Sequence, residues 1–345
     1  MPREALRWPD GSMSWGDYSE PVLGGDEVRV RSEFAAAKHG TELAFSPEKR
    51  VNRGRYDSTL QLFVPEPPAG ASAPSRAGGV GNMTVGTVVE AGAEVKTLAV
   101  GDRVLLHGGF RQTHVRPEGR CWKIPASMSW KSAVCLDPAD FAMGAIRDGH
   151  ARIGDAVAVF GLGAIGLMCV QFARLAGASL VIGVEPLPNR RAIAQRLGAD
   201  VVLDPDACDA GLEIKQATAR RGADVVLEYS GSETAMQAAL RGVAHGGNVV
   251  AGAFPPPYKA GLDFGAEAHL NIPNIIFSRA CSRPDRDHPR WDEARILATC
   301  LRLLQDGRLS GEAIVTPVVD FADVLEHYPL IGIEPNKYVK IGVKF

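Results

Sequence analysis

The stretch DAVAVFGLGAIGLMCVQFARLAG, Asp155 to Gly177, decides the fold that this sequence predicts. It opens with an apolar run, Ala156 to Phe160, of the kind that forms a strand buried on both faces of a sheet. From Ile165 onward the apolar residues recur with helical spacing instead. A buried strand that turns directly into a helix begins a βαβ unit, so the sequence predicts an α/β protein with a parallel sheet.

Three glycines, Gly161, Gly163 and Gly166, occupy the turn between the predicted strand and helix in the spacing G-x-G-x-x-G. Such glycines permit a tight turn, let a pyrophosphate approach the backbone and let the helix pack on the strand. The helix that starts there offers free N–H groups and a partial positive charge. We therefore expect the glycines, with Ala164 and Ile165, to bind a dinucleotide. The alternative is that the glycines only close a tight turn.

An acidic residue at the end of the next strand separates a dinucleotide site from a chance glycine pattern. The β-branched run Ser179 to Val184 predicts that strand, and Glu185 follows it at the spacing of roughly 20 residues that the ribose contact requires. A carboxylate there accepts hydrogen bonds from ribose hydroxyls and repels a 2′-phosphate, so the sequence favours NAD over NADP. Arg190 and Arg191 lie close behind and can bind such a phosphate, which leaves NADP open as the second choice.

Size and composition limit what else the chain can be. At 345 residues it is longer than one ordinary core, and its 46% hydrophobic and 23% charged residues are typical of a globular protein. The net charge of -2 and the lack of a basic tract exclude nucleic acid as the expected partner. No apolar run approaches the roughly 20 residues of a membrane span, and the N-terminal segment lacks the apolar core of a signal peptide. We expect a cytoplasmic protein with a small-molecule substrate and no membrane partner.

The segments on either side of the glycine turn predict two kinds of structure. The N-terminal part reads as short strands and loops, including a surface loop at 64–81, and favours a small, partly closed barrel. After Glu185, strands and helices alternate as far as a long amphipathic helix at 291–304, as a doubly wound sheet requires. The last residues, 338–345, alternate like a strand outside that series. We therefore expect the tail to return to the first domain.

Over nearly its full length the sequence resembles the medium-chain dehydrogenase/reductase superfamily. The resemblance rests on GTEL at 40–43, GNMTVGTVVEAGAEVKTLAVGDRVLL at 81–106, DGHARIGDAVAVFGLGAIGLMCVQFARLAGA at 148–178 and RLGADVVLDP at 196–205. It implies a GroES-like, β-rich catalytic domain formed by residues 1–133 plus 303–345, beside a Rossmann NAD-binding domain formed by residues 134–302. It also implies an active site in the cleft between the domains and a homodimer or homotetramer, as is common in the superfamily.

The positions at which zinc-dependent members hold their catalytic zinc differ in this sequence. His39 stands where the resemblance places a cysteine, Asn82 where it places a histidine, and Asp137 where polyol dehydrogenases have a glutamate. The cysteine-rich lobe for a structural zinc is missing, and the six cysteines form no C-x-x-C pair. Zinc prefers thiolate and imidazole, and an amide is a poor substitute. We expect no metal site, with weak metal binding by His39 and Asp137 as the alternative.

Four residues are candidates for catalysis without zinc. An alcohol that gives up a hydride must also lose its hydroxyl proton. His39 is the predicted acceptor because imidazole titrates near working pH, and Thr41 matches the family's proton-relay hydroxyl. Asp137 is predicted to orient His39 or bind a substrate hydroxyl, and Asn82 to donate to the reacting oxygen. Glu42 is predicted to support the loop or a neighbouring arginine and not to react. The alternatives are a His39 satisfied by backbone, and caps or turn residues at the other three positions.

Two serines are placed near the cofactor by position alone: Ser230, after a predicted strand end, and Ser278, at the end of the last predicted Rossmann strand. The sequence favours an NAD-dependent alcohol dehydrogenase that acts without zinc on a secondary hydroxyl of a polyol, sugar or cyclitol. This assignment follows the resemblance to the zinc-lacking branch with bacteriochlorophyllide dehydrogenase-like and sugar- or cyclitol-modifying enzymes. The alternatives are a zinc-free NADPH-dependent enone or quinone reductase, against which Glu185 counts, and a nucleotide-binding module without catalysis.

Overall fold

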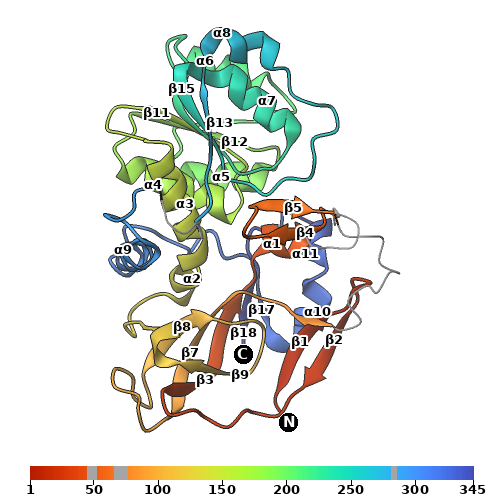
Figure 1. The fold of residues 1–345 in the computed structure, drawn as a ribbon, viewed down its shortest axis with the longest axis vertical. Helices are drawn as coiled ribbons and strands as arrows, with labels where there is room; N and C mark the ends of the chain where they lie inside the picture. The colour runs from red at the N-terminus through yellow and green to blue at the C-terminus, as the bar shows by residue number, and fades with distance from the viewer. Residues whose placement is uncertain (45–52, 66–76, 281–285) are drawn as a thin grey trace.

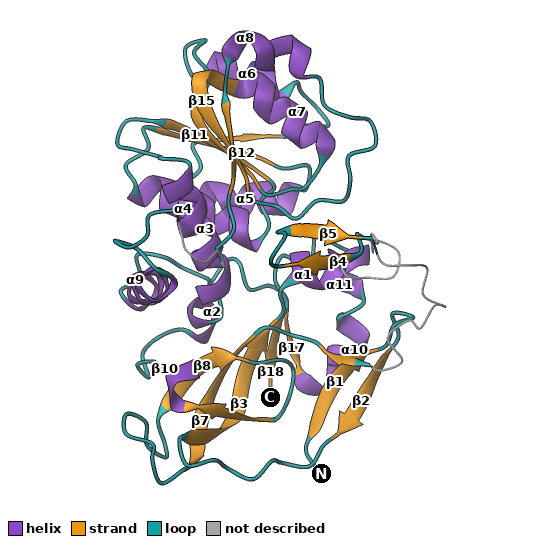
Figure 2. Ribbon diagram, viewed as in Figure 1, coloured by secondary structure: helices purple, strands orange, loops and turns teal. Residues whose placement is uncertain are grey.

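A parallel sheet and an antiparallel, β-rich half lie at opposite ends of the computed structural model (Figure 1). The structure describes residues 1–44, 53–65, 77–280 and 286–345, with the side chains of residues 41, 43 and 44 also outside the description. Helices surround the parallel sheet, whereas the other half consists mainly of strands and loops (Figure 2). The sequence-based prediction of two kinds of structure is therefore confirmed.

The parallel sheet has the strand order β13-β12-β11-β14-β15-β16, which is the doubly wound order with its reversal beside β11. Every residue of β11 is buried, as its apolar run predicts. Ligands of such sheets bind at the carboxyl ends of the strands, next to the point where the order reverses. The strands are β11 (Ala156–Phe160), β12 (Leu180–Val184), β13 (Val201–Leu203), β14 (Ala223–Glu228), β15 (Val243–Ala251) and β16 (Asn274–Phe277).

The helices of this half cover both faces of the sheet and leave its strand ends open to the other half. Helix α3 packs on α4 and on α9, and α9 lies beside α2 and α3 in Figure 1. The helices are α2 (Trp130–Ala133), α3 (Leu136–Asp148), α4 (Ala164–Leu175), α5 (Pro188–Arg196), α6 (Ala210–Ala217), α7 (Glu233–Gly242), α8 (His269–Asn271) and α9 (Glu293–Gln305).

The β-rich half is built on a sheet of order β10-β8-β7-β3-β18-β17, with β9 also paired to β3. The smaller sheets are β2-β1-β6 and β4-β5. Short helices α1 (His39–Ala44), α10 (Val324–His327) and α11 (Leu330–Ile333) complete this half. The strands are β1 (Arg3–Arg7), β2 (Met13–Asp17), β3 (Glu27–Ala36), β4 (Arg55–Asp57), β5 (Leu62–Val64), β6 (Gly78–Gly79), β7 (Met83–Ala91), β8 (Arg103–His107), β9 (Thr113–Pro117), β10 (Cys121–Lys123), β17 (Val318–Asp320) and β18 (Gly342–Lys344).

The C-terminal tail returns to the first half of the chain, as its alternating pattern predicts. Strand β18 pairs antiparallel with β3 and parallel with β17, so the two ends of the sequence share one sheet. One hydrophobic cluster joins the halves, because Met83 and Leu105 of the β-rich sheet belong to the same core as Val157 and Val159 of β11. The junction between the halves is therefore held by packed apolar side chains.

The segment 64–81 is not a loop throughout, because Gly78–Gly79 forms β6 and pairs with β1; residues 66–76 of it lie outside the described residues. The domain boundaries 1–133 plus 303–345 and 134–302 stay a prediction. In the described part of the chain, no helix combines the length and the apolar composition needed to cross a membrane.

Candidate active site

The glycine turn has the close contacts that its motif predicts. Gly161 has a φ of +82°, and a Cβ there would lie 2.5 Å from the backbone nitrogen of Ser230. A Cβ on Gly166 would lie 1.9 Å from the carbonyl oxygen of Gly161, so helix and strand meet backbone to backbone. At Gly163 the nearest atom to a Cβ would be Nη1 of Arg190, 3.9 Å away. Two glycines therefore serve packing, while Gly163 leaves open space for a ligand.

Helix α4 directs its N-terminus at this open space. Gly163 is the N-cap, and no side chain accepts a hydrogen bond from the first turn. The first N–H groups of an α-helix, here those of Ala164, Ile165 and Gly166, have no acceptor within the helix. Unpaired N–H groups and the positive end of the helix dipole together form an anion site. The geometry fits the pyrophosphate of a dinucleotide.

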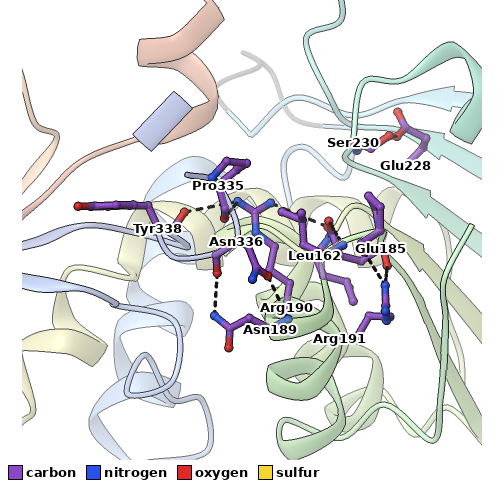
Figure 3. Close-up of polar contacts among 12 residues, drawn as sticks. Leu162, Glu185, Asn189, Arg190, Arg191, Glu228, Ser230, Pro335, Asn336 and Tyr338 are labelled. Carbon is purple, nitrogen blue, oxygen red and sulfur yellow. Dashed lines mark hydrogen bonds and ion pairs between the residues drawn. The ribbon is translucent and has the colours of Figure 1, made fainter. Parts of the chain in front are cut away.

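Arg190 connects the nucleotide half to the C-terminal segment beside the glycine turn (Figure 3). Its Nη2 donates to the carbonyl oxygens of Pro335 and Tyr338, at 3.1 and 3.5 Å. The neighbouring Asn189 donates from its backbone and side-chain nitrogens to Asn336, at 3.1 and 3.0 Å. Burial lowers the pKa of Arg190, although the negative charge of Glu185 acts in the opposite direction. The start of α5 is therefore held by residues of the β-rich half.

Glu185 follows β12, and hydrogen bonds fix its carboxylate under the glycine turn. The residue is 4% exposed, and its Oε2 accepts the N–H of Leu162 at 2.7 Å (Figure 3). Arg191 donates to the carbonyl oxygen of Glu185 at 2.7 Å and forms a 2.9 Å ion pair with Asp204. The guanidinium of Arg191 therefore has a carboxylate partner in this structure. The sequence identified Glu185 and Arg191 but not the pairing with Asp204.

Ser230 lies at the carboxyl end of β14, where a buried carboxylate holds it. Glu228 accepts the N–H of Ser230 at 2.7 Å and the hydroxyl of the same serine (Figure 3). It also accepts the N–H of Gly231 at 3.0 Å. Burial raises the pKa of Glu228. These bonds fix Ser230 against Gly161 at the glycine turn. Ser278 follows β16 as a buried residue and lies next to Gly144 of α3, and its predicted cofactor contact is untested.

The imidazole of His39 accepts a hydrogen bond from the backbone, so the proton-acceptor role predicted for this residue does not fit the observed contacts. Its Nε2 accepts the N–H of Ile341 at 2.9 Å. A neutral imidazole has one acceptor nitrogen, so the other nitrogen carries the proton. Burial, followed by the positive charges of Lys340 and Arg190, lowers the pKa of His39 to about 3. At neutral pH the ring is uncharged and its lone pair is occupied, as in the alternative reading of a histidine satisfied by backbone.

Asp137 pairs with a lysine instead of with His39, its predicted partner. Nζ of Lys38 lies 2.7 Å from Oδ1 of Asp137, and the two side chains are 23% and 9% exposed. Lys38 precedes α1 in the β-rich half, and Asp137 lies in the first turn of α3. The ring of Phe141, one turn further along α3, faces the ammonium with 4.0 Å between Nζ and the ring centroid. The ion pair therefore crosses the junction of the two halves.

Asn82 and Glu42 lie on segments that border Lys38. The side-chain nitrogen of Asn82 is buried and has no hydrogen-bond partner among the residues that the structure describes. Glu42 accepts the backbone N–H of Lys38 at 2.6 Å and the hydroxyl of Tyr328. Glu42 therefore supports the loop, as predicted. Thr41 lies in α1, but its side chain falls outside the described residues, so its relay role stays a prediction.

The residues at the three metal positions do not fit a zinc ion. The acceptor nitrogen of His39 is bound to the backbone, Asn82 offers an amide, and Asp137 has an ammonium group as its partner. Zinc sites need three or four nitrogen, sulfur or oxygen donors around one point, and an adjacent cation repels the ion. No three His, Cys, Asp or Glu side chains in the described ranges are grouped to hold a metal.

The sequence did not predict several contacts of this site, because these contacts join segments that are far apart in the chain. Lys38 and Asp137 are 99 residues apart, and Arg190 and Pro335 are 145 apart. One signal was available for the first pair: Lys38 directly precedes the segment His39 to Glu42, where the resemblance places a metal ligand. No comparable signal in the sequence indicates the contact between Arg190 and Pro335.

Comparisons with known proteins show that this chain is similar to dehydrogenases. The family profile described as "Zinc-binding dehydrogenase" matches residues 164–282. D-guloside 3-dehydrogenase of Escherichia coli K12 is 43% identical over 341 residues, which cover 95% of this chain and 96% of the relative. The structure of 2R,3R-butanediol dehydrogenase from Bacillus subtilis has a TM-score of 0.80 at 22% identity, with all of both chains covered. That of galactitol-1-phosphate dehydrogenase from Escherichia coli has 0.77 at 17% identity, covering 99% of this chain and 100% of that one.

Its identity to D-guloside 3-dehydrogenase over nearly its full length identifies the chain as an NAD(P)-dependent oxidoreductase that acts on CH–OH groups. The chain belongs to the zinc-binding dehydrogenase family, as its identity to the Escherichia coli enzyme over nearly its full length shows. The resemblance to the medium-chain dehydrogenase/reductase superfamily is thereby confirmed. So is the combination of a GroES-like half with a Rossmann half.

Proposed function

We propose that this protein is an NAD(H)-dependent dehydrogenase that oxidises a secondary hydroxyl of a sugar, polyol or cyclitol, or reduces the corresponding ketone, without a catalytic zinc. The observation that carries the proposal is the 43% identity to D-guloside 3-dehydrogenase across 95% of the chain, in a protein whose glycine turn is intact. A sugar glycoside is therefore the first substrate class to test.

The choice of NAD over NADP rests on the residues after β12. The carboxylate of Glu185 is fixed where the adenosine ribose binds in such folds and can accept its hydroxyls. A 2′-phosphate would meet that negative charge. Of the two nearby arginines, Arg191 is already paired with Asp204, and Arg190 lies 3.9 Å from Glu185 and donates to Pro335. These contacts support NAD as the cofactor that this chain binds.

The proposal that zinc is absent does not conflict with the family description. The family profile matches residues 164–282, which belong to the nucleotide half, whereas the three metal positions at 39, 82 and 137 lie outside the match. The residues at those positions support a metal-free site because an ammonium group, an amide and an engaged imidazole are there. The description of the family therefore does not require a metal in this chain.

The residues at the junction suit a substrate with many hydroxyl groups. NAD, when bound, supplies the acceptor for the hydride. Asn82 has a buried donor that finds no partner in the part of the chain that the structure describes, and a hydroxyl or carbonyl oxygen of the substrate can accept from it. Asp137 offers a second carboxylate oxygen beyond the one bonded to Lys38. Buried polar groups that gain a hydrogen-bond partner only from a hydroxylated ligand favour such a ligand over an apolar one.

We further propose that the protein acts in the cytoplasm as a homodimer or homotetramer on a small molecule alone. The absence of a basic tract supports the lack of a nucleic-acid partner. Size-exclusion chromatography with light scattering tests the oligomer. A monomer at micromolar concentration would contradict that part of the proposal.

A substrate screen tests the central proposal. Methyl hexopyranosides, free sugars, polyols, cyclitols and simple alcohols are each incubated with NAD and with NADP, and the absorbance of the reduced nicotinamide is followed. We expect turnover with a glycoside or polyol and a higher kcat/KM with NAD. Activity restricted to enones or quinones with NADPH would replace the proposal by the reductase alternative. NADH binding without turnover of any alcohol or ketone would indicate a binding module.

A further inference from the structure

A lysine ammonium lies at the junction where zinc-dependent relatives of this fold are expected to hold a metal cation. Lys38 and Asp137 come from opposite halves of the molecule, and their charged groups are 2.7 Å apart. Most of each side chain is covered, so the pair is shielded from the screening that weakens surface ion pairs. A charge held in this way is rare unless it has a partner or a function.

The backbone and the neighbouring elements fix the direction of Lys38. Glu42 of α1 accepts its backbone N–H at 2.6 Å, and Phe141 of α3 lies against its ammonium group. His107 at the end of β8 is close enough for both charges of the pair to act on its pKa. Burial is the largest influence and lowers the pKa of His107. The charge of Asp137 raises this pKa, and the charge of Lys38 lowers it. The ammonium of Lys38 thus contacts the carboxylate of Asp137 and the ring of Phe141.

A short series of contacts connects Lys38 to the carboxyl end of the parallel sheet. The carbonyl oxygen of Phe141 accepts the hydroxyl of Tyr229 at 3.1 Å. The N–H of Tyr229 donates in turn to the carbonyl oxygen of Phe160, which directly precedes Gly161 of the glycine turn, at 2.9 Å. These contacts link Phe141, whose ring faces the ammonium, to Phe160 at the strand end where a dinucleotide binds in this fold.

We propose that Lys38 is the residue that exchanges a proton with the reacting oxygen of the substrate, and that Asp137 is its positioning residue. The inference rests on the proposed dehydrogenase function. In the oxidation direction the carbinol C–H electron pair leaves as a hydride to the nicotinamide. The O–H proton passes to the Lys38 amine, and the carbon–oxygen bond becomes a carbonyl. In reduction the ammonium returns that proton to the oxygen as the hydride arrives.

The proposed role needs a group that releases a proton in one direction of the reaction and takes one up in the other. Lysine is suited to this because its protonation responds readily to the surroundings, whereas arginine remains protonated.

Replacement of Lys38 provides the first test, with a matched control in the same half of the molecule. Lys123 of β10 makes an ion pair of the same length, 2.7 Å, with Asp102, at a side chain that is 58% exposed. We expect Lys38→Met to lower kcat by between about 100-fold and 10,000-fold, the range of general acid–base catalysis, and Lys123→Met to leave it unchanged. Equal rates in the wild type and in Lys38→Met would overturn the proposal.

Two further variants separate proton exchange from a static charge. Lys38→Arg keeps the positive charge but cannot release a proton, so we expect it to fall within tenfold of Lys38→Met. If Lys38→Arg keeps half of the wild-type rate, charge alone is sufficient and proton exchange is excluded. In Lys38→Ala, added ethylamine is expected to restore activity in proportion to its free amine concentration, which a merely structural lysine would not allow.

Chemical labelling tests the same residue without turnover. Lysines are acetylated with acetic anhydride, and the modified peptides are quantified by mass spectrometry. With NADH and a saturating glycoside we expect at least fivefold slower labelling of Lys38 and no change at Lys123. In Asp137→Asn, labelling of free protein at Lys38 should become faster at an unchanged unfolding temperature, because the ammonium loses its counter-ion. Unchanged labelling of Lys38 in both cases would overturn the roles of both residues.

The outcomes distinguish this inference from the proposed function on which it rests. A wild type that oxidises a glycoside together with an equally active Lys38→Met retains the function and removes Lys38. A wild type that binds NADH but oxidises no alcohol and reduces no ketone removes the function, and the role of Lys38 with it.

Discussion

The glycine turn and the ion pair between Lys38 and Asp137 are the two ends of one candidate site, and they are built in different ways. The turn is made by neighbours in the sequence and by two strand ends of the same sheet, and backbone contacts fix it. The ion pair is made by side chains 99 residues apart and crosses from one half of the molecule to the other. Backbone contacts therefore fix the glycine turn, whereas the ion pair depends on how the two halves of the molecule pack together.

This difference indicates where the family can vary. A backbone turn that binds a pyrophosphate tolerates few substitutions, because Gly161 and Gly166 meet other backbone atoms. Side chains at a junction can be exchanged without changing the fold. The fold of this chain matches that of butanediol dehydrogenase at a TM-score of 0.80 although only 22% of the residues are identical.

The largest effect is expected at the turn, where two glycines allow packing and ligand binding to be separated. A Cβ on Gly166 would lie 1.9 Å from a backbone oxygen, so Gly166→Ala should lower the free energy of unfolding by about 3 kcal/mol. Gly163→Ala has open space and should stay within about 1 kcal/mol of the wild type while weakening NADH binding by roughly tenfold or more. Urea unfolding and fluorescence titration measure the two quantities. Similar losses of stability in both variants would contradict this division.

The second prediction concerns the pH dependence of the free energy of unfolding, and it involves His39, the residue after Lys38 of the ion pair. The pKa of His39 is about 3 in the folded protein against 6.5 for a free histidine. Between these values the unfolded chain binds more protons, so His39 contributes fully above pH 6.5 and its contribution is lost as the pH falls towards 3. Buried His114, also with a pKa of about 3, acts in the same direction.

Urea unfolding of the wild type and of His39→Gln at pH 7.5 and pH 4.5 tests this. The glutamine oxygen can accept the N–H of Ile341 without titrating, so we expect a smaller loss of stability at pH 4.5 in the variant. An equal loss in both proteins would show that His39 is not a buried neutral residue.

A smaller effect is expected for cofactor choice. Glu185→Gln removes the negative charge near the ribose and should weaken NAD by about tenfold, the value of one charged hydrogen bond. Asp204→Asn leaves Glu185 intact but releases Arg191 from its ion pair, so it should strengthen NADP relative to NAD. Calorimetric titration with both nucleotides measures these changes. An unchanged preference in both variants would place the selectivity elsewhere.

The sequence could predict the first end of the site almost completely and the second only in part. The strand Ala156–Phe160, the helix after it and the acid after β12 follow from local patterns, and the structure has them where expected. The positions 39, 82 and 137 were found through the resemblance. Their partners were not, because a pairing such as that of Lys38 with Asp137 depends on how distant segments pack.

His39 illustrates the limit most clearly. Its type and place suggested a base, yet a backbone N–H from the C-terminal segment occupies its acceptor nitrogen. That segment returns to the first sheet through β18, and the alternating pattern of the tail predicted the return. The packing that brings the N–H of Ile341 within 2.9 Å of the His39 ring could not be predicted from the pattern.

The most direct test of the account is the rate of glycoside oxidation by protein that has been freed of metal. Wild-type enzyme is treated with dipicolinate and dialysed, its zinc content is measured by mass spectrometry, and initial rates with NAD are recorded before and after Zn²⁺ is added. We predict less than one zinc per ten chains and an unchanged rate in all samples. A rate that disappears with the metal and returns with stoichiometric zinc would contradict the account.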